Sequence, residues 1–327
     1  MTVQTRGKKK DLIKSARTRW SLIILTSLGA FVFALLFGSK VLHKEDKLMQ
    51  KPETPQKKIS LKKFETSHEI EKLVKEASKS FPGKAGIVFY DILENKVIGS
   101  NTKEEFEAAS LIKIPILIEY FRQVKAGKLS PGESVVIKNS MKAGGSGSIK
   151  NLPEGSSVSY EELAGLMITK SDNTAADILI NKLGMKNINS IAIELGCSAT
   201  FLKRTIWDFA AIDRGMDNTA TPEDMMILLR AIYEGKAVDE ASSASMINIL
   251  KRQENRKMIP AYLPEGVEVA HKTGELNGIL HDCGIIYMEK CPYILCLLGK
   301  NIKNKDEARK FWADFSLRIY KVMQKRG

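Results

Sequence analysis

The sequence has few of the residues that build disulfide scaffolds and metal centres. Its 327 residues include four cysteines, four histidines, 10 prolines and 23 glycines. Four cysteines are too few for a small fold held together by disulfides, and the glycine and proline contents exclude collagen-like and low-complexity proteins. Cysteine and histidine do not cluster at metal-ligand spacing, so we expect neither a metal ion nor another cofactor.

Net positive charge is also small over most of the chain, although the formal net charge of the whole chain is +13. Residues 1–63 hold 15 Lys and Arg against 4 Asp and Glu, whereas residues 64–327 hold 36 against 34. Nucleic-acid binding requires clustered positive charge on the folded domain itself. We therefore expect no nucleic-acid partner.

A run of twenty residues without a formal charge, 20–39, follows a basic segment, 1–19. A helix of this length crosses a hydrocarbon core of about 30 Å. A cleaved signal peptide is the alternative, but large residues occupy the positions where its cleavage site needs small ones. We predict a basic cytoplasmic tail (1–19), a transmembrane anchor (20–39) and a Lys/Pro-rich solvated linker (40–63).

The remaining residues, 64–327, read as strands at both ends with helices between them. Apolar spacing predicts helices at 67–80, 111–126, 160–168, 174–183, 185–195, 222–234, 242–253 and 305–323. Strands are expected at 85–90, 96–100, 267–273, 283–288 and 292–298. The fold class is α/β: an antiparallel sheet flanked by helices, formed by the two ends of this domain, plus an inserted all-α lobe.

The pattern Ser-x-x-Lys occurs at Ser60–Lys63, Ser100–Lys103 and Ser110–Lys113. We select the third match because Ser110 opens a helix with the apolar run LIKIPILIEYF behind it. Residues three apart on a helix share a face, so Lys113 is expected beside Ser110. A buried lysine can lose its proton near neutral pH and activate a serine hydroxyl as a nucleophile.

Two further tripeptides follow in order: Ser171-Asp172-Asn173 before a helix, and Lys272-Thr273-Gly274 at the end of an apolar strand. Alone, the first can be a helix N-cap and the second a strand that leads into a turn. Their joint occurrence after a helix-opening Ser-x-x-Lys is hard to assign to chance. The three motifs together are the set found in class A β-lactamases and penicillin-binding proteins.

On these motifs, residues 64–327 resemble the class A β-lactamase family of serine hydrolases. The spacings of 61 residues from Ser110 to Ser171 and 101 residues from Ser171 to Lys272 suit that family. So do the segments GGSGSIKNLPEGS (144–156), TATPEDM (219–225) and HKTGELNGILHDCGIIY (271–287). The resemblance implies an α/β sheet flanked by helices, an all-α lobe and an active site between them.

The resemblance implies catalytic roles for the first two motifs. Ser110 attacks the acyl carbonyl and carries the acyl group, while Lys113 helps to remove its proton. Ser171 passes a proton to the leaving nitrogen. The backbone amides of Ser110 and Glu275 hold the oxyanion.

The resemblance also implies which residues bind substrate. Asn173 orients Lys113 and holds the substrate amide. Lys272 and Thr273, in the motif completed by Gly274, bind the substrate carboxylate. No metal is needed for this chemistry.

The chain departs from the family where a glutamate normally hydrolyses the acyl-enzyme. Trp207-Asp208 stands where Trp-Glu is expected, and the loop to Pro222 is short. Aspartate is one methylene shorter, and a displacement of about 1 Å can cost a general base on the order of 100-fold in rate. Asp208 is therefore a working base, a weak base, or a structural carboxylate paired with Arg204 or Arg214.

Three functions stay open on the sequence. The first is a serine hydrolase that opens β-lactams through an acyl-enzyme on Ser110. The second is a D-Ala-D-Ala carboxypeptidase or other cell-wall peptide hydrolase that β-lactams acylate, and the third is a non-catalytic penicillin-binding or sensing domain. The expected partners are a small-molecule substrate (a β-lactam or a peptidoglycan stem peptide) and the cytoplasmic membrane. We expect a monomer with an extracytoplasmic catalytic domain.

The other chemically active residues have structural interpretations. His271 and His281 are expected to support the strand beside the site. If Glu289-Lys290 forms a hairpin turn, Cys283 lies opposite Cys296. Such a pair can bridge, but we favour two small buried side chains.

Overall fold

The computed structural model describes residues 55–326. Contacts divide the chain after residue 60, and the fold described below is that of residues 61–327, whose first helix starts at Pro55. The predicted cytoplasmic tail (1–19) and transmembrane anchor (20–39) lie outside the described residues. Among the helices that are described, none combines the length and the apolar character that crossing a membrane needs.

Within the described residues, a five-stranded sheet joins the two ends of the domain in the order β2-β1-β9-β8-β7. Every neighbouring pair is antiparallel, and β1 pairs with β9 along its whole length. This confirms the expected sheet shared by the two ends. The strands are β1 (Lys84–Asp91), β2 (Lys96–Ser100), β7 (Val269–Leu276), β8 (Ile279–Ile286) and β9 (Tyr293–Lys300).

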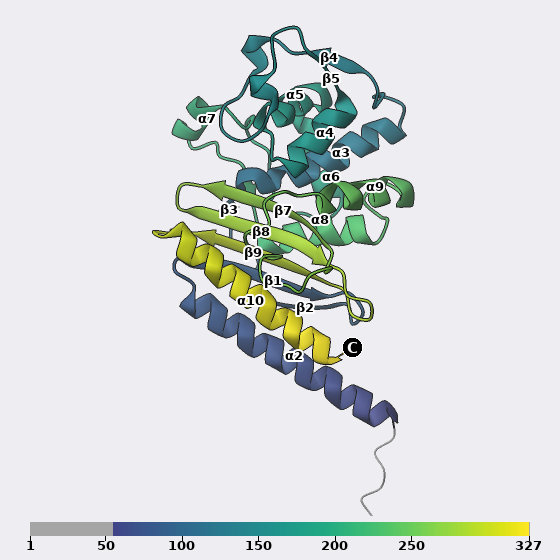
Figure 1. The fold of residues 1–327 in the computed structure, drawn as a ribbon, viewed down its shortest axis with the longest axis vertical. Coiled ribbons are helices and arrows are strands. Elements are labelled where there is room, and N and C mark those ends of the chain that lie inside the picture. The colour runs from purple at the N-terminus through teal and green to yellow at the C-terminus, as the bar shows by residue number, and fades with distance from the viewer. Residues whose placement is uncertain (1–54, 327) are drawn as a thin grey trace, which may run out of the picture. The chain divides into compact units, whose positions relative to one another are not determined.

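The sheet is buried on both faces because its alternate side chains enter two different cores. Ile87 and Phe89 pack into one hydrophobic cluster, while their neighbours Val88 and Tyr90 pack into the other. Successive strand residues point to opposite faces, so each face needs a cover. Two helices, α2 (Pro55–Ser80) and α10 (Lys305–Arg326), lie side by side over one face (Figure 1).

The helices between the two groups of strands form the all-α lobe and cover the other face of the sheet (Figure 1). This confirms the expected inserted lobe. Its helices are α3 (Lys113–Lys125), α4 (Tyr160–Thr169), α5 (Asn173–Leu183), α6 (Met185–Glu194), α7 (Phe209–Asp213), α8 (Pro222–Tyr233) and α9 (Glu240–Lys251). Of these, α8 and α9 contact the sheet through β9 and β7 respectively. The cleft between lobe and sheet is bordered by the turn that carries Ser110, the turn between α4 and α5, and β7.

Four short strands were missed because two or three residues carry no periodic signal. They form two small antiparallel pairs: β3 (Phe106–Glu107) with β6 (Thr219–Ala220), and β4 (Ser134–Val136) with β5 (Ser157–Ser159). The first pair matters for function, because β3 leads directly into the segment that carries Ser110.

The first described helix extends into the segment expected to be a linker. We expected a solvated linker over 40–63, but α2 begins at Pro55, inside that segment. Proline is favoured at the first position of a helix, where its missing N–H has no partner to lose. The residues that follow are mostly good helix formers. The lysines on which the linker prediction was based are therefore equally compatible with a helix.

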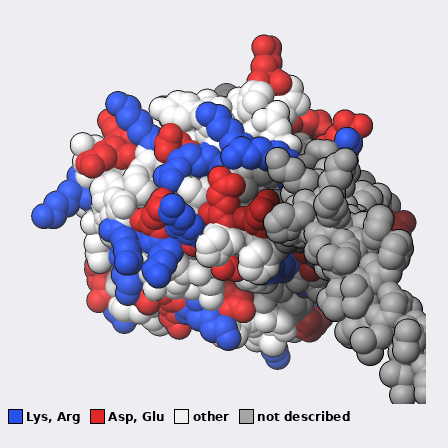
Figure 2. Space-filling view, turned by 90° about the horizontal axis from the view of Figure 1, so that it is seen from below, with Lys and Arg blue, Asp and Glu red and all other residues white. Residues whose placement is uncertain are grey.

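Charges of both signs are mixed on the face of the molecule seen in Figure 2. Ion pairs join α2 to α10, including Arg318 with Glu76 and Lys325 with Glu69. On the part of this face that the described residues form, Lys and Arg are therefore interspersed with Asp and Glu.

The four cysteines are buried. Cys283 and Cys296 are direct partners across β8 and β9, as their expected register required. Both side chains have no exposed surface and belong to the hydrophobic cluster under the all-α lobe. They occupy the structure as small buried side chains rather than as a disulfide.

Candidate active site

Ser110 lies in a tight turn between β3 and α3. The turn is a 3-10 helix, η1 (Ala109–Ile112), and Ala109 has a positive φ of 45°. Leu111 and Ile112 are fully buried, so they fix the turn in the core while Ser110 stays partly exposed. We expected Ser110 to open the helix itself; instead the α-helix begins at Lys113.

Ser171 lies in the turn between α4 and α5, with a positive φ of 53°. Its neighbour Asp172 is the N-cap of α5 and accepts a hydrogen bond from the Ala175 N–H. The second carboxylate oxygen of Asp172 accepts from the N–H groups of Ser148 and Ile149. The N-cap interpretation thus holds for Asp172, which leaves the Ser171 side chain directed at Ser110.

The third motif lies on β7, on the other side of the cleft. Lys272 is fully buried, and Thr273 is 5% exposed. A Cβ on Gly274 would stand 3.3 Å from Ala109 Cβ and 3.4 Å from the Ala108 carbonyl oxygen. Glycine therefore lets β7 come close to the turn that carries Ser110.

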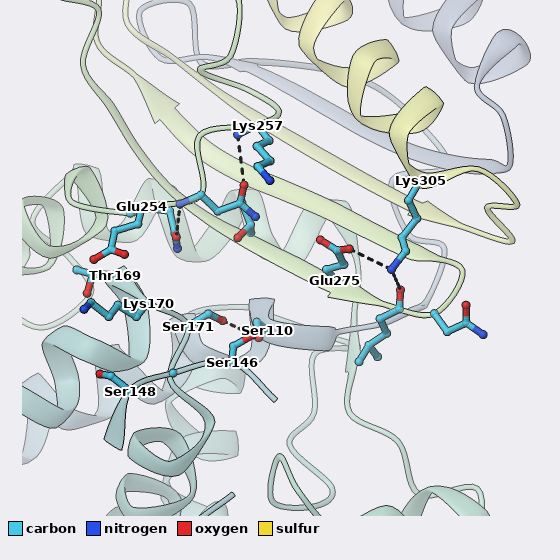
Figure 3. Close-up of a pocket in the computed structure, with 16 residues that line it drawn as sticks. Ser110, Ser146, Ser148, Thr169, Lys170, Ser171, Glu254, Lys257, Glu275 and Lys305 are labelled. Atoms are coloured by element: carbon cyan, nitrogen blue, oxygen red, sulfur yellow. Dashed lines mark hydrogen bonds and ion pairs between the residues drawn. The ribbon is translucent and has the colours of Figure 1, made fainter. Parts of the chain in front are cut away.

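The hydroxyl of Ser171 joins the three motifs. It donates a hydrogen bond to Ser110 Oγ at 2.9 Å (Figure 3). It accepts from Lys113 Nζ at 3.2 Å and from Lys272 Nζ at 3.1 Å. Lys113 also donates to Asn173 Oδ1 at 2.8 Å and to the Ser171 carbonyl at 2.7 Å. Within residues 55–326, the hydrogen bonds of Lys113 thus reach Ser110 through Ser171 rather than directly.

Both lysines are held toward their neutral forms. Burial lowers the pKa of Lys113 well below its usual value, and the nearby charge of Lys272 lowers it further. Burial likewise lowers the pKa of Lys272 to about 7, opposed by the Asp282 carboxylate. An amine that is neutral near physiological pH can accept a proton, so the site holds a base next to a hydroxyl.

Two cavities meet at Ser110. The larger, of about 790 Å³, runs along the cleft and is lined mainly by polar and charged residues (Figure 3). The smaller, of about 190 Å³, lies toward α7 and includes Trp207 and Phe209 in its wall. Thr273 lines only the larger cavity and Asn173 only the smaller, whereas Ser110 and Glu275 line both.

The side chain of Glu275 turns toward α10. Its Oε1 accepts from Lys305 Nζ at 3.0 Å and from an Arg309 nitrogen at 2.6 Å. Burial raises the pKa of Glu275, but these two cations outweigh it and hold the pKa below its usual value. Glu275 therefore keeps its charge paired at the rim of both cavities.

Asp208 caps a helix. It is the N-cap of the five-residue helix α7, and its Oδ1 accepts from the Ala211 N–H at 3.0 Å. It is not among the residues that line either cavity around Ser110. The expected partner Arg204 pairs instead with Asp217, at 2.7 Å.

Sequence reasoning missed Asp177. Its two carboxylate oxygens accept from the Ile206 N–H at 2.5 Å and the Trp207 N–H at 3.2 Å. Burial raises the pKa of Asp177, against the N–H groups that stabilise its charged form. A signal was available, because Asp177 stands four residues after Asn173 on α5 and so faces the same way.

The two histidines near the third motif are buried in the support of the site. His271 Nδ1 lies 2.8 Å from Asp282 Oδ1. His281 Nε2 lies 2.9 Å from the Glu107 carbonyl, and its Nδ1 accepts from the Gly299 N–H. Burial lowers the pKa of His281 to about 4, so the ring is neutral. Its two nitrogens connect β3 to β9 through hydrogen bonds. Among the described residues, no group of three or more His, Cys, Asp or Glu could hold a metal ion.

Known proteins resemble this chain over most of its length. A family model described as the beta-lactamase enzyme family matches residues 66–323. Beta-lactamase 3 of Bacillus cereus is 26% identical over 246 residues, covering 74% of this chain and 76% of that protein.

Solved structures share the fold at similar identity. A β-lactamase from Sphaerobacter thermophilus DSM 20745 is 27% identical, with a TM-score of 0.72 over 79% of this chain and 97% of that one. A mutant of PBP-A, solved as an acyl-enzyme complex with penicillin-G, is 26% identical, with a TM-score of 0.72 over 80% and 97%.

Proposed function

Because the chain belongs to the β-lactamase enzyme family, we propose that it is a class A-like serine hydrolase that forms an acyl-enzyme with β-lactams on Ser110. The observation that carries the proposal is the hydrogen-bonded group around Ser171. A serine hydroxyl is a weak nucleophile unless a base removes its proton. In this site the Ser171 hydroxyl lies within hydrogen-bond distance of the Ser110 hydroxyl and of two buried amines, those of Lys113 and Lys272.

Acylation begins with the proton of Ser110. As its oxygen attacks the carbonyl carbon, the Ser110 proton passes to Ser171 Oγ, and the Ser171 proton passes to neutral Lys113. The protonated Lys113 then returns a proton through Ser171 to the leaving nitrogen. Protons are conserved in this cycle. The transfers among Ser110, Ser171 and Lys113 run between atoms that are in hydrogen-bond contact, with donor and acceptor exchanged relative to the resting site.

The rest of the site holds the substrate. The backbone amides of Ser110 and Glu275 are proposed to bind the oxyanion, since donors fixed before the reaction stabilise developing charge best. Lys272 and Thr273, in the motif completed by Gly274, are proposed to bind the substrate carboxylate. Asn173 orients Lys113 through its Oδ1 and can hold the substrate amide.

Release of the acyl group is proposed to be slow. Hydrolysis needs a base within reach of a water at the ester, and a displacement of about 1 Å can cost roughly 100-fold in rate. The Asp208 carboxylate accepts a backbone N–H at the start of α7, and both oxygens of Asp177 are taken up by backbone N–H groups. The acyl-enzyme is therefore expected to accumulate.

The engagement of the Asp208 and Asp177 carboxylates by backbone N–H groups also favours a second candidate function. An enzyme that cleaves a cell-wall peptide and is blocked by β-lactams needs the acylation machinery but not a base suited to β-lactam hydrolysis. The large polar cavity beside Ser110 has room for a peptide that carries several charged groups. We therefore keep a D-Ala-D-Ala-type carboxypeptidase as the alternative.

The proposed location follows from the substrates. Both candidate functions act on molecules outside the cytoplasmic membrane. The uncharged run 20–39 is proposed to anchor the chain with residues 1–19 inside and the catalytic domain outside.

The test is a chromogenic cephalosporin mixed with the purified full-length chain and with its Ser110→Ala variant. We expect a burst of one product per enzyme followed by slow turnover, with both phases lost in the variant. Rapid sustained turnover would contradict slow release of the acyl group and would mean that the enzyme hydrolyses β-lactams efficiently. Absence of any acylation would overturn the proposed function.

A further inference from the structure

The tip of the β1–β2 hairpin is apolar and exposed, which is unusual for a turn. Turns are mostly built from Gly, Asn, Asp, Ser and Pro. Here Leu93 stands in the turn with 57% of its surface exposed, and Val97, in β2, is 46% exposed. Phe64, on α2, is 72% exposed. We call Phe64, Leu93 and Val97 the hairpin-tip surface.

The hairpin-tip surface borders one hollow between α2 and the hairpin. The hollow measures about 470 Å³, and Phe64 and Val97 both line it, together with Lys63 and Glu94. Lys63 Nζ lies 2.7 Å from Glu94 Oε1, so an ion pair joins α2 to the turn beside Leu93. Exposed apolar side chains that gather at one place, rather than singly, mark a contact surface.

The turn that carries Leu93 is held in one conformation. Asp91 Oδ1 accepts from the N–H groups of Leu93 and Glu94, each at 3.1 Å. The Tyr90 hydroxyl donates to Asn95 Oδ1 at 2.8 Å, and Asn95, with a φ of 51°, adopts the left-handed conformation that asparagine tolerates. Leu93 is therefore exposed because its own hydrogen-bonded turn presents it.

Lysines stand beside these apolar groups. Lys63 and Lys96 are both partly exposed, although each also pairs with a glutamate. The chain that leads to this surface is more basic, because residues 40–63 contain eight Lys against three Asp and Glu. Lysine keeps its methylene groups on apolar surface and its ammonium group in water. Apolar groups bordered by lysines therefore suit the boundary between lipid headgroups and hydrocarbon.

The length of the preceding chain also favours a lipid surface as the partner. Fifteen residues, 40–54, separate the uncharged run 20–39 from Pro55, where α2 begins. A chain of that length spans at most about 50 Å. With the run 20–39 in the membrane, as proposed above, the bilayer is within reach of the hairpin-tip surface. Tethering raises the effective concentration of the partner, so a weak contact suffices.

We propose that the hairpin-tip surface inserts into the headgroup region of an anionic lipid bilayer and sets the orientation of the catalytic domain on the membrane. This inference rests on the proposed membrane location and goes beyond the proposed reaction. The three apolar side chains supply the contact. Attraction between the basic segment 40–63 and anionic lipids keeps the tip at the surface.

The consequence for catalysis is an active site that opens away from the membrane. In the sheet order β2-β1-β9-β8-β7, the hairpin tip belongs to the β2 edge, whereas the Lys272 motif belongs to β7, at the other edge (Figure 1). Four strand spacings of about 4.8 Å separate these edges by roughly 19 Å. The contact thus leaves the cleft open to substrates that arrive from the side away from the bilayer.

The test measures contact between a tryptophan at the tip and lipids brominated near the headgroup, which quench tryptophan fluorescence. The full-length chain is reconstituted into vesicles of phosphatidylcholine and phosphatidylglycerol in equal parts, with or without bromine. Leu93→Trp is the reporter. Val136→Trp is the matched reporter, because Val136 is 53% exposed and lies on β4, in the all-α lobe (Figure 1). The difference from the unchanged chain isolates each added tryptophan.

We expect brominated lipid to quench Leu93→Trp, and the bilayer to shift its emission to shorter wavelength, with neither effect on Val136→Trp. Adding Phe64→Ala to the Leu93→Trp chain should reduce the quenching, because a second apolar group is lost from the tip. Replacing phosphatidylglycerol with phosphatidylcholine should also reduce it, because the basic segment loses its attraction to the surface. Circular dichroism checks that each variant is folded.

The outcomes separate this contact from the proposed reaction. Equal quenching of the two reporters, no quenching of Leu93→Trp, or quenching independent of Phe64 and of anionic lipid would overturn the contact. A shift in emission without quenching would also overturn it, because a second protein molecule would then cover the tip. Failure of the chain to float with vesicles would overturn the proposed location and the contact together. Acylation of Ser110 by a penicillin, measured on the same samples, decides the proposed reaction independently.

Discussion

At the scale of single residues, the hydrogen bonds of the site depend on the Ser171 hydroxyl, which does not cap a helix. Its main chain adopts a left-handed conformation, and its neighbour Asp172 takes over the capping of α5. The hydroxyl is thereby released to bond Ser110 and to accept from both buried lysines. A residue that could have been an ordinary helix cap instead connects Ser110 to the two buried lysines through hydrogen bonds.

Ser171→Ala should therefore nearly abolish acylation. The variant keeps Ser110 and both lysines but removes the hydroxyl that connects them, so the rate should fall roughly 100- to 10,000-fold, the usual worth of general acid–base catalysis. The measurement is covalent labelling by a fluorescent penicillin over time. Ser198→Ala, an exposed serine outside the site, is the control; equal rates in the two variants would contradict this role for Ser171.

The buried lysines predict a pH dependence with a definite sign. Burial lowers the pKa of Lys272 to about 7, so this residue is charged below that pH and neutral above it. If its charge binds the substrate carboxylate, KM for a carboxylate-bearing β-lactam should rise as pH increases through about 7. The lowered pKa of Lys113 affects the reaction in the opposite direction, because a higher pH favours the neutral amine that can accept a proton.

The measurement is KM and kcat for a cephalosporin between pH 5 and 9. Lys272→Arg supplies the control, because arginine keeps its charge throughout this range. We expect the variant to lose the rise in KM at high pH. A KM that stays constant across the range in the unchanged chain would contradict the role given to the charge of Lys272.

At the scale of elements, short segments decide the chemistry more than long helices do. The 3-10 turn η1 presents Ser110. The five-residue helix α7 and the loop that leads into it carry Phe209 and Trp207, which line the smaller cavity. Each is held by a few directed contacts: Leu111 and Ile112 in the core for η1, and the Asp208 cap for α7. Single substitutions in these segments should thus act strongly.

Asp208 tests this directly, because capping and base catalysis predict different outcomes for aspartate and asparagine. Asn and Asp cap helices about equally well, whereas loss of the cap in an Ala variant costs about 1 kcal/mol. We expect Asp208→Asn to release the acyl group at a rate within about 2-fold of the unchanged chain. Asp208→Ala should increase hydrogen exchange over 209–213, measured by mass spectrometry. Loss of acyl release in Asp208→Asn would instead make Asp208 the base.

At the scale of the whole domain, one segment ties the all-α lobe to the sheet across the cleft. After α9, Gln253 donates to the Ile168 carbonyl at the end of α4. Farther along, the Ile259 N–H donates to Asp282 on β8, and Ser316 on α10 donates to the Ile259 carbonyl. The segment also lines the large cavity through Lys257, so its attachment fixes one wall of the site.

Asp282 is the centre of that attachment, and its loss should destabilise the domain. Asp282→Ala leaves the Ile259 N–H and His271 Nδ1 buried without their partner, which costs roughly 2–5 kcal/mol. The measurement is the free energy of unfolding in urea. Asp306→Ala is the control, since Asp306 forms a surface pair with Arg309 and such pairs are worth about 1 kcal/mol or less. Equal effects of the two substitutions would contradict the structural role of Asp282.

Several features of this protein could be predicted from the sequence by itself. Apolar spacing predicted the antiparallel sheet shared by the two ends of residues 64–327 and the helical lobe between them, because periodic burial is local information. The apolar run behind it singled out Ser110 among three Ser-x-x-Lys matches, because only that match precedes a long apolar helix. Register along β8 and β9 likewise placed Cys283 opposite Cys296.

Other features were decided only by the tertiary structure. Lys113 shares a helix face with Ser110 in sequence terms, yet it reaches Ser110 through Ser171, which comes from a different turn of the chain. The loop of Trp207 and Asp208 presents its aromatic side chain to the cavity while the carboxylate caps α7. Which of two neighbouring side chains faces a site in an irregular loop depends on long-range anchors, here Asp177 and the glycines at 144 and 145. No periodic pattern encodes such anchors, so only the folded chain could reveal them.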